Sequence, residues 1–578
     1  MSFFTNLAPP GANSDGNPDV VSQATAVLDS AHLGDITGAF GTLRRDDAAP
    51  RRTWLHRVKT LLCILGPGLI VMIGDNDAGG VATYTQAGQN YGTHLLWTLL
   101  ALAPVLYLNQ EMVLRLGAVS GVGHARLIFE RFGRFWGAFS VIDLFVLNTL
   151  TIVTEFVGVN LALTYFGLSK YVAVPLAVAL LLVMPATGKF ARWERGMMVL
   201  IIPLNLILIP YFFLTHPVVA PIARGTFVPN FPGGLNSTLL LLITAIVGTT
   251  VAPWQLFFQQ SNVVDKRITA RWVPYERVDT LIGCFLVIVG GGIFMTAAAF
   301  GLAHTHVFGN YVDPLHSARS LRHYVGSGAG ALLAIALLDL SLIGASAVTL
   351  STSYTLGDVF KTRHSLHWKV SQAKGFYAVF AGSIIASAAL VLIPHVPLGT
   401  LTVGVQALAG ILLPSATVFL LLLCNDKAVL GPWVNTTKRN IFTGVVIWIL
   451  VLLSIALTAA TLFSNISSAT LKLGFLGGAG VGIVGGTAVT LLNRRQRVSN
   501  GPTGRMDAVE VDRYLPWRER RSELRERRAN FRMPPLSSLT RPLMSTQRRV
   551  GLTVLRSYLL VAFALAIVKI AEVASGSH

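Results

Sequence analysis

Three polar residues interrupt an otherwise apolar segment, residues 66–92, and they are Asp75, Asn76 and Asp77. A carboxylate in the hydrocarbon core of a bilayer costs about 3 kcal/mol on insertion scales, so it is seldom without a function. Gly79 and Gly80 follow closely, and glycine is a poor helix former, so we expect the helix to open here. Backbone groups freed at membrane depth need protein or a water-filled cavity beside them. Acids beside an opened backbone predict a cation site.

A second interruption lies in the apolar segment 237–263, at Pro253. Proline removes a backbone donor and clashes with the preceding turn, so the helix is expected to open near Thr249–Ala252. Four apolar segments separate the two interrupted ones, which places each at the start of a five-span unit, the two units having opposite orientation. Paired discontinuous helices at matching positions are typical of secondary transporters, whose substrate site lies between the breaks.

The elements that position both interruptions are expected to be membrane-spanning helices. The 578 residues are 53% hydrophobic and only 13% charged, which excludes a soluble domain of any size except at the two ends. Apolar runs of about 20 residues each predict twelve spans. They lie at 59–89 (broken), 93–118, 136–166, 169–187, 195–215, 237–263 (broken), 278–302, 330–356, 374–394, 399–424, 440–463 and 470–492. A further apolar stretch, 552–574, either spans the membrane or lies on it.

The positions of lysine and arginine predict how the chain crosses the membrane. A basic loop follows every even-numbered span, and four basic residues precede the first span: Arg51, Arg52, Arg57 and Lys59. Basic loops of this kind face the cytoplasm, so we expect a multi-pass protein of the cell membrane with a cytoplasmic N-terminus. The net charge of +19 falls mainly in these loops and in the C-terminal segment. This distribution predicts contacts with anionic lipid and none with nucleic acid.

Composition divides the chain into four regions. Residues 1–55 are polar and are predicted to be a disordered cytoplasmic N-terminal tail. Residues 56–425 are predicted to form a ten-span inverted-repeat transport core, and residues 426–493 add spans eleven and twelve. Residues 494–578 are a basic cytoplasmic segment with a final apolar helix. Within it, the Arg- and Glu-rich part 505–549 is either an amphipathic helix on anionic lipid or a solvated charged helix.

Other polar groups point to no further site. Five of them crowd the loop between spans seven and eight, where a solvated loop is favoured over a metal-capturing vestibule because no helical ligand spacing links them: His304, His306, Asp313, His316 and His323. The three cysteines lie apart in apolar segments, so neither a disulfide framework nor a thiolate metal site is expected. No catalytic triad, nucleotide-binding loop or HExxH motif occurs, so we expect no enzymatic activity and no cofactor.

The residues around the two interruptions resemble the natural resistance-associated macrophage protein (NRAMP) family of divalent-metal transporters. The resemblance covers roughly residues 59–425. It rests on GPGLIVMIGDNDAGG, YGTHLLW, EMVLRLGAVSG in span two, TEFVGV in span three, IVGTTVAPWQLFF in span six and the Gln406 to Pro414 spacing in span ten. It implies an all-α integral membrane protein with the leucine-transporter-type inverted repeat, five plus five spans with spans one and six broken, and additional C-terminal spans.

The resemblance also implies which residues form the site. Asp77 matches the metal-binding aspartate of the family, and Gln406 matches the span-ten glutamine that closes on the ion. Gly74 and Thr249 match positions whose carbonyl groups face the ion. Asp75 has no counterpart in the family motif. It either acts at a distance or through water, or it is hydrogen-bonded to a serine or threonine of a neighbouring span.

This chain departs from the family pattern at two ligand positions. Members that carry transition metals have Asp-Pro-Gly-Asn in span one and Met-Pro-His in span six, where this chain has Gly80 for the asparagine and Ala252 for the methionine. Loss of a soft thioether removes a preference for Mn²⁺, Fe²⁺ or Cd²⁺ and enlarges the cavity. Mg²⁺ keeps several waters and suits a roomy site of oxygen ligands. The replacements resemble the branch called NRAMP-related magnesium transporters.

The residues for proton coupling depart as well. Proton-coupled members carry two histidines in span six and an Asp-x-x-Glu pair in span three. In this chain the two histidine positions hold Trp254 and Gln259. The aspartate position of span three holds Ile152, and the glutamate is retained as Glu155. Neither tryptophan nor glutamine titrates near neutral pH. We therefore expect weak or absent proton coupling, with Mg²⁺ entering down a potential of about 100 mV that favours a dication by ~4.6 kcal/mol.

The expected function is alternating-access transport of divalent metal cations, above all Mg²⁺ and in addition Mn²⁺. Three alternatives stay open: a proton-coupled Mn²⁺/Fe²⁺ transporter, a sodium-coupled amino-acid carrier of the same fold, and a membrane receptor or scaffold that does not transport. The two acids of span one argue against the amino-acid carrier, because they would repel the carboxylate of its substrate. The retained Asp77 and Gln406 argue against a receptor or scaffold that does not transport.

Overall fold

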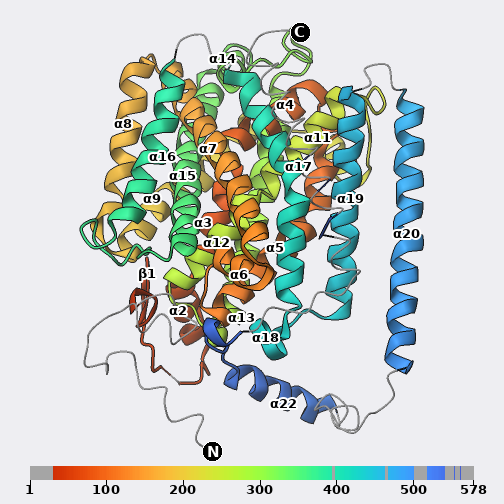
Figure 1. Cartoon of the computed structure of the whole chain (residues 1–578). Coiled ribbons are helices and arrows are strands. Elements are labelled where there is room, and N and C mark those ends of the chain that lie inside the picture. Colours follow the sequence, from red (N-terminus) through yellow and green to blue (C-terminus); the bar gives the residue numbers. More distant parts are fainter. Residues whose placement is uncertain are drawn as a thin grey trace, which may run out of the picture.

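The computed structural model describes residues 30–47, 49–393, 398–462, 467–499 and 517–539, together with 552, 553, 557 and 560. Within these ranges eleven helices are long and apolar enough to cross a membrane, and one bent helix pair makes a twelfth span. The twelve spans predicted from the sequence are therefore present. In Figure 1 they form one helical bundle, except that the last span, Ser468–Ser499 (α20), stands apart at its right-hand edge.

The spans are helices with the following bounds. They are α2 (Trp54–Ile64), α3 (Pro67–Ile73), η2 (Gly74–Asn76) and α4 (Ala78–Tyr91) for span one, then α5 (Leu96–Ser120), α7 (Arg134–Tyr165), α8 (Lys170–Val183), α9 (Phe190–Leu214), α11 (Ser237–Thr250) with α12 (Pro253–Asp265), α13 (Val273–Gly301), α15 (Ser327–Phe360), α16 (Lys374–Leu392), α17 (Leu398–Cys424), α19 (Thr437–Leu462) and α20 (Ser468–Ser499). Short helices lie between and after them: α6 (His124–Phe132), α10 (Val219–Phe227), α14 (Pro314–Tyr324), α18 (Lys427–Leu430) and α22 (Trp517–Asn530).

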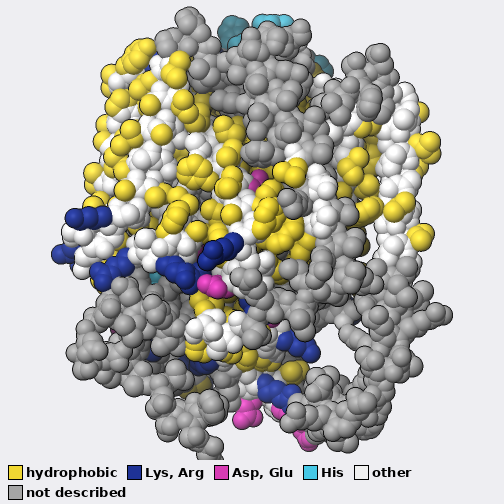
Figure 2. All heavy atoms as spheres, viewed as in Figure 1, with side chains coloured by type: hydrophobic (Ala, Val, Ile, Leu, Met, Phe, Trp, Pro, Cys, Tyr) yellow, Lys and Arg dark blue, Asp and Glu magenta, His cyan; other side chains and the backbone are white. Residues whose placement is uncertain are grey.

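The two broken spans lie at the centre of the bundle. The most apolar window of span six is 94% buried, whereas that of α20 is only 6% buried. α4 and α11 contact one another and both contact α17, so spans one, six and ten meet. Figure 2 shows hydrophobic side chains over the flank of the bundle and lysine and arginine gathered toward its lower end. The breaks are thus enclosed in protein, as freed backbone at membrane depth requires.

Span six opens where proline predicted that it would. α11 ends at Thr250 and α12 begins at Pro253, with Ala252 in an extended conformation between them (φ −84°, ψ 145°). Proline at the first position of a helix loses nothing, because its missing N–H would have had no partner there. The predicted opening near Thr249–Ala252 is confirmed.

Span one is broken twice, and the sequence predicted only the break at the acids. The unpredicted break is a 55° bend between α2 and α3. Gly66 turns the chain there with φ 154°, a conformation that favours glycine. Asp279 of α13 then accepts the N–H groups of Gly66 at 3.1 Å and Gly68 at 2.8 Å. A carboxylate satisfying free N–H groups stabilises the start of a helix.

Residues 30–47 are folded, so the prediction of a disordered tail over residues 1–55 is wrong for this part. η1 (Ser30–His32) precedes two antiparallel strands, β1 (Ile36–Gly38) and β2 (Gly41–Leu43). This hairpin contacts α2 and, through β1, α9. Residues 1–29 lie outside the described residues.

Long-range contacts hold the hairpin in place. The Ala39 N–H donates to Glu194 Oε2 at 2.5 Å, across 155 positions of sequence. A Cβ on Gly38 would lie 2.2 Å from the carbonyl oxygen of Cys63, so β1 approaches α2 as closely as only glycine permits. The composition of the segment carries no trace of these partners, which is why it suggested disorder.

Two further predictions concern the loops and the C-terminal region. The loop between spans seven and eight contains a helix, α14, whose first turn is capped by Asp313 accepting the His316 N–H at 2.7 Å. The sequence did not predict this helix, which aspartate before proline starts. His304, His306 and His323 are exposed, in keeping with the solvated loop favoured over a metal-capturing vestibule. α22 forms part of the predicted amphipathic segment 505–549. The stretch 552–574 lies almost wholly outside the described residues.

Candidate metal-binding site

Asp77 lies at the break of span one, where it caps the second half of the helix. Its Oδ1 accepts the Gly80 N–H at 2.7 Å, as the N-cap of α4. The free N–H groups of a helix N-terminus favour a carboxylate at this position. Asp77 is 2% exposed. The predicted metal ligand is thus held in place by the helix that it begins.

Three oxygen atoms from spans one and six converge beside Gly80. A Cβ on this glycine would lie 2.9 Å from Thr249 Oγ1, 3.0 Å from the carbonyl oxygen of Asp75 and 3.6 Å from Asp77 Oδ1. The Thr249 hydroxyl also donates to the Asp75 carbonyl at 3.4 Å. Hydroxyl, carbonyl and carboxylate oxygens are the ligand types that hard cations take. Because position 80 has no side chain, nothing from that residue covers these oxygens.

Gln406 of α17 reaches the same aspartate from span ten. Its Nε2 donates to Asp77 Oδ1 at 3.3 Å. It also lies directly over Gly79, where a Cβ would come 1.7 Å from the amide nitrogen. Glycine at position 79 is therefore required for this approach. The structure brings together Asp77, Thr249 and Gln406, which the sequence placed in three different spans.

Asp75 is buried without the hydrogen bonds that a buried carboxylate usually has. It is 1% exposed, and neither carboxylate oxygen has a partner among the described residues. The hydrogen bond to a serine or threonine of a neighbouring span, one of the two alternatives, is thus absent from this part of the chain. Gln255 of α12 is the polar side chain beside Asp75, although the two form no hydrogen bond of ordinary geometry. Its Oε1 accepts from Gln110 Nε2 at 3.0 Å, a pair of amides for which the sequence offered no motif.

A second carboxylate, Glu155 of α7, lies beside Asp77. Its Oε2 accepts the Ala78 N–H at 3.2 Å. A Cβ on Gly344 of α15 would lie 2.8 Å from Glu155 Oε2 and 2.9 Å from the Asp77 Cβ, so both acids pack against one glycine. Ile152, at the position of the missing aspartate, is fully buried. Glu155 therefore supports the backbone at the break, and an apolar side chain stands where the relay would continue.

Gly74 and Ala252 lie at the ends of the two half-helices. Gly74 is the C-cap of α3, and the Trp254 ring would lie 3.4 Å from a Cβ placed on it. Ala252 is the N-cap of α12, is 3% exposed, and has a carbonyl that accepts the Gln255 N–H at 3.2 Å. The span-one carbonyl that the Thr249 side chain contacts is that of Asp75. The sequence had pointed to Gly74 for a backbone ligand.

The two span-six histidine positions hold Trp254 and Gln259 in this chain. Gln259 donates through Nε2 to Glu276 Oε1 at 3.3 Å. His124 of α6, which lies outside the spans, reaches span six through Gln260, with Nδ1 and Oε1 separated by 2.7 Å. Burial lowers the pKa of His124 to about 4. This imidazole is therefore neutral throughout the physiological pH range, and a base with so low a pKa does not exchange protons near pH 7.

The acidic side chains alone cannot enclose an ion. Among the residues that the structure describes, no three His, Cys, Asp or Glu side chains are grouped closely enough to hold a metal. A cation at the break would therefore complete its coordination with carbonyl, hydroxyl and amide oxygens and with water. Mg²⁺ commonly binds in this way, through one or two carboxylates and several retained waters.

Comparison with known proteins agrees with this fold. Residues 68–460 match the family described as natural resistance-associated macrophage protein-like. The divalent metal cation transporter MntH of Ralstonia nicotianae is 30% identical over 396 residues, which cover 65% of this chain and 86% of that protein. MntH of Staphylococcus aureus is 24% identical over 427 residues, covering 69% and 91%.

A solved structure has the same fold. The manganese transporter of Eremococcus coleocola, crystallised with an aromatic bis-isothiourea compound, superposes with a TM-score of 0.55 at 22% identity, over 78% of this chain and 97% of that one. The inverted repeat expected from the resemblance is consistent with this match and with the two broken spans. The chain belongs to the natural resistance-associated macrophage protein-like family.

Proposed function

We propose that this protein is a secondary transporter of divalent metal cations, Mg²⁺ above all and Mn²⁺ as well, which works by alternating access with weak or no proton coupling. Family membership supports transport of a divalent cation, since the relatives in Ralstonia and Staphylococcus are divalent metal cation transporters. The protein would lie in the cell membrane with a cytoplasmic N-terminus, and its transport core would occupy residues 56–425.

One observation carries the preference for Mg²⁺. The three atoms nearest to a Cβ on Gly80 are all oxygens, from Thr249, Asp75 and Asp77. The family's thioether position holds Ala252, whose methyl group cannot coordinate. A site of oxygen donors without the thioether lacks the soft ligand that favours transition metals. It suits a hard cation that keeps part of its water shell.

Each predicted residue then has a role in the cycle. Asp77 would bind the cation directly, with the backbone at Gly74 and Thr249 and the amide oxygen of Gln406 completing the protein ligands. Asp75 would act through water, which fits a buried carboxylate with both oxygens free among the described residues. Gly80 and Ala252 would contribute space for the retained waters. Movement of span ten relative to the broken spans would open and close the site.

The retained pair of Asp77 and Glu155 keeps one alternative open, a proton-coupled Mn²⁺/Fe²⁺ transporter. Two carboxylates packed against Gly344 could share a proton. Against this, the next relay position is Ile152 and the span-six positions are Trp254 and Gln259. None of these three side chains exchanges protons near pH 7.

The test is uptake into proteoliposomes of Mg²⁺, Mn²⁺ and Ca²⁺, with a pH-sensitive dye inside. We expect Mg²⁺ uptake driven by an inside-negative potential, Mn²⁺ uptake inhibited by excess Mg²⁺, and no acidification. Mn²⁺ uptake that excess Mg²⁺ leaves unchanged would refute the magnesium preference. Acidification that follows metal entry would refute uncoupled transport and support the proton-coupled alternative. Absence of any metal uptake would refute the proposed function itself.

A further inference from the structure

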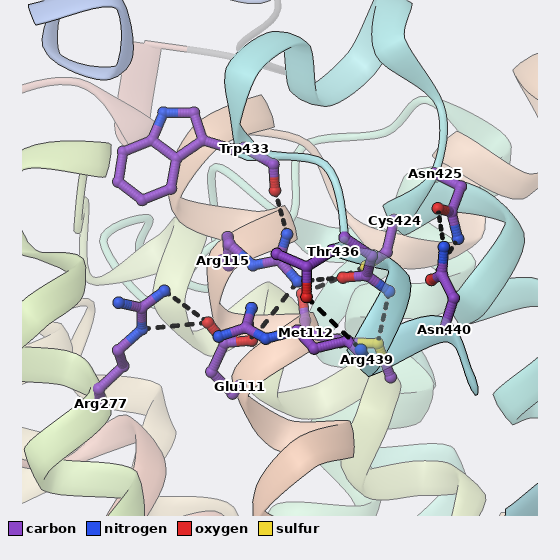
Figure 3. A network of polar contacts seen from close by, with 11 residues as sticks. Glu111, Met112, Arg115, Arg277, Cys424, Asn425, Trp433, Thr436, Arg439 and Asn440 are labelled. Atoms are coloured by element: carbon purple, nitrogen blue, oxygen red, sulfur yellow. Dashed lines mark hydrogen bonds and ion pairs between the residues drawn. The ribbon is translucent and has the colours of Figure 1, made fainter. Parts of the chain in front are cut away.

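One carboxylate at the predicted cytoplasmic end of the bundle is shared by several arginines. Glu111 of α5 is buried, and Figure 3 shows three arginine side chains converging on it. Their ion pairs with Glu111 are 2.6 Å from Arg277 of α13, 2.9 Å from Arg439 of α19 and 3.4 Å from Arg115 of α5. The cluster therefore joins spans two, seven and eleven.

A fourth arginine reaches this cluster from the C-terminal segment. Arg528 of α22 lies over the Trp433 ring, 5.1 Å from its centroid, and donates through Nε to the Pro432 carbonyl at 3.2 Å. The Trp433 Nε1 in turn donates to the Arg528 carbonyl at 3.2 Å. Burial first, and then repulsion from Arg277, Arg115 and Arg439, lower the pKa of Arg528. Arg115 donates to the carbonyl of the same Trp433, so Arg528 lies beside the Glu111 cluster and is repelled by its three arginines.

The charges in this cluster do not balance. Glu111 pairs with three guanidinium groups and that of Arg528 lies nearby, and none of the four forms an ion pair with another described carboxylate. Arg115 is 1% exposed, and its Nε has no hydrogen-bond partner among the described residues. Arg277 and Arg439 expose 31% and 33% of their side chains, so their outer N–H groups remain accessible. The buried Arg115 is held by Glu111, by the Trp433 carbonyl and by Asn435 Oδ1. One carboxylate for four guanidinium groups still leaves an excess of positive charge, which favours a bound anion at the accessible N–H groups.

The surroundings favour an anion with several oxygen atoms. Arg277 lies in the first turns of α13 and Arg439 in the first turn of α19, and helix N-termini add positive potential. Forked guanidinium groups match the oxygens of phosphate in particular. We propose that Arg277, Arg439 and Arg528, supported from below by Arg115 and Glu111, form a binding site for a phosphate-bearing anion between the transport core and α22.

The binding test uses the full-length chain in neutral detergent, without metal, and two sources of phosphate. Phosphatidylglycerol against phosphatidylcholine, counted by native mass spectrometry, represents a lipid headgroup, and inorganic pyrophosphate in calorimetry represents a soluble anion. Each arginine near an anionic group contributes to the affinity, so the double variant Arg277→Gln with Arg439→Gln should bind the anion roughly 30-fold more weakly. Preferential binding of phosphatidylglycerol assigns the site to lipid, and binding of pyrophosphate alone assigns it to a soluble phosphate.

The matched control removes two charges from another loop at the same end, Lys189→Gln with Arg192→Gln, both exposed residues. This control should change affinity less than about twofold, because it leaves the proposed contacts intact. Arg277→Lys with Arg439→Lys should keep most of the binding. If the glutamine pair does not fold, Arg528→Gln on the surface helix replaces it, with an expected loss of about fivefold. Equal binding by wild type and test variant, an equal loss in the control, or no binding of either anion would overturn the proposal.

Discussion

Two groups of buried carboxylates lie along span one, and they differ in whether the protein supplies a cation. The midplane group consists of Asp75, Asp77 and Glu155, and none of them forms an ion pair with a described lysine or arginine. The lower group lies at the bend between α2 and α3. It contains one buried lysine and three acids: Lys266, Glu194, Glu276 and Asp279.

The lower group is internally satisfied to a large extent. Lys266 Nζ donates to Glu194 Oε1 at 2.6 Å and to the Ile64 carbonyl at 2.7 Å. Asp279 accepts three backbone N–H groups at the start of α3. Breaking a buried pair by removing one partner is strongly destabilising, because the other charge stays behind. This group therefore works as structure, locking the bend of span one to α9 and α13.

The midplane group lacks such a counterion, and we propose that this difference separates a binding site from a structural one. Buried carboxylates without partners either take up protons or wait for a cation. The converging oxygens beside Gly80 favour the second outcome. A resident lysine would occupy the place of the proposed substrate permanently, and its absence leaves that place open to a cation.

The largest effect is expected from Asp77→Asn. Loss of charge at a direct ligand should reduce Mg²⁺ uptake at least ~100-fold, since changes one shell further out already cost about 10–100-fold. Asparagine can still cap α4, so folding should be unchanged. Asp313→Asn, at the cap of α14, is the control and should transport normally. Uptake near the wild-type rate in Asp77→Asn would remove the basis for separating the two groups.

The lower group should respond in stability and not in selectivity. Lys266→Met leaves Glu194 buried without its cation and should destabilise the purified protein by about 3–5 kcal/mol. Lys266→Met combined with Glu194→Gln should recover much of that loss, because the uncompensated charge is gone. Thermal unfolding of both variants in detergent measures this. If the single and double variants were equally stable, the lower group would not be a compensated ion pair.

A substitution in the hairpin at residues 30–47 should destabilise the same region less strongly. Gly38→Ala would place a Cβ 2.2 Å from the Cys63 carbonyl oxygen and should destabilise the bend by about 1–3 kcal/mol. Gly375→Ala, with no atom near its Cβ, is the matched control. Protease cleavage within residues 30–47 should become faster only in Gly38→Ala. Equal cleavage of the two variants would mean that the hairpin is not held against α2.

The selectivity of the midplane group can be tested by restoring the missing ligands. Gly80→Asn with Ala252→Met should shift the ratio of Mn²⁺ to Mg²⁺ uptake toward Mn²⁺ by roughly tenfold, about 1.4 kcal/mol. Gly80→Ala fills the same space without a ligand and should lower transport of both ions alike. An unchanged ratio in the double variant would contradict the argument from oxygen donors.

The smallest effect is expected from Glu155→Gln. The glutamine carbonyl can still accept the Ala78 N–H, so the break should keep its shape and Mg²⁺ uptake should fall less than about threefold. His124, with its pKa lowered to about 4, stays neutral between about pH 6 and pH 8 and should add no pH dependence to uptake there. A steep pH dependence that Glu155→Gln abolishes would show that Glu155 carries a proton.

The sequence predicted those parts of the structure that depend on residues close together in the chain. Gly79, Gly80 and Pro253 act on their own turns of helix, so both midplane breaks followed from residue type. Asp279 at the start of α3 is 213 positions from Gly66, and nothing near Gly66 indicates that partner. The same holds for Ala39 with Glu194. The bend at Gly66 and the hairpin at residues 30–47 depend on such long-range polar contacts, which is why the sequence did not predict them.

The candidate site follows the same division. Asp77, Thr249 and Gln406 could be named because the resemblance to the family supplied their positions, and the structure brings all three together. The surroundings of Asp75 could not be named. Its isolation depends on which side chains fail to reach it, and an unmet hydrogen bond has no sequence pattern.

The central claim is that the midplane acids lack a resident cation because they bind the transported one. Calorimetric titration of Mg²⁺ into the purified wild type and into Asp77→Asn tests this most directly. The account predicts one Mg²⁺ site in the wild type, lost in Asp77→Asn and kept in the Asp313→Asn control. Mg²⁺ binding of equal affinity and stoichiometry in Asp77→Asn would contradict it.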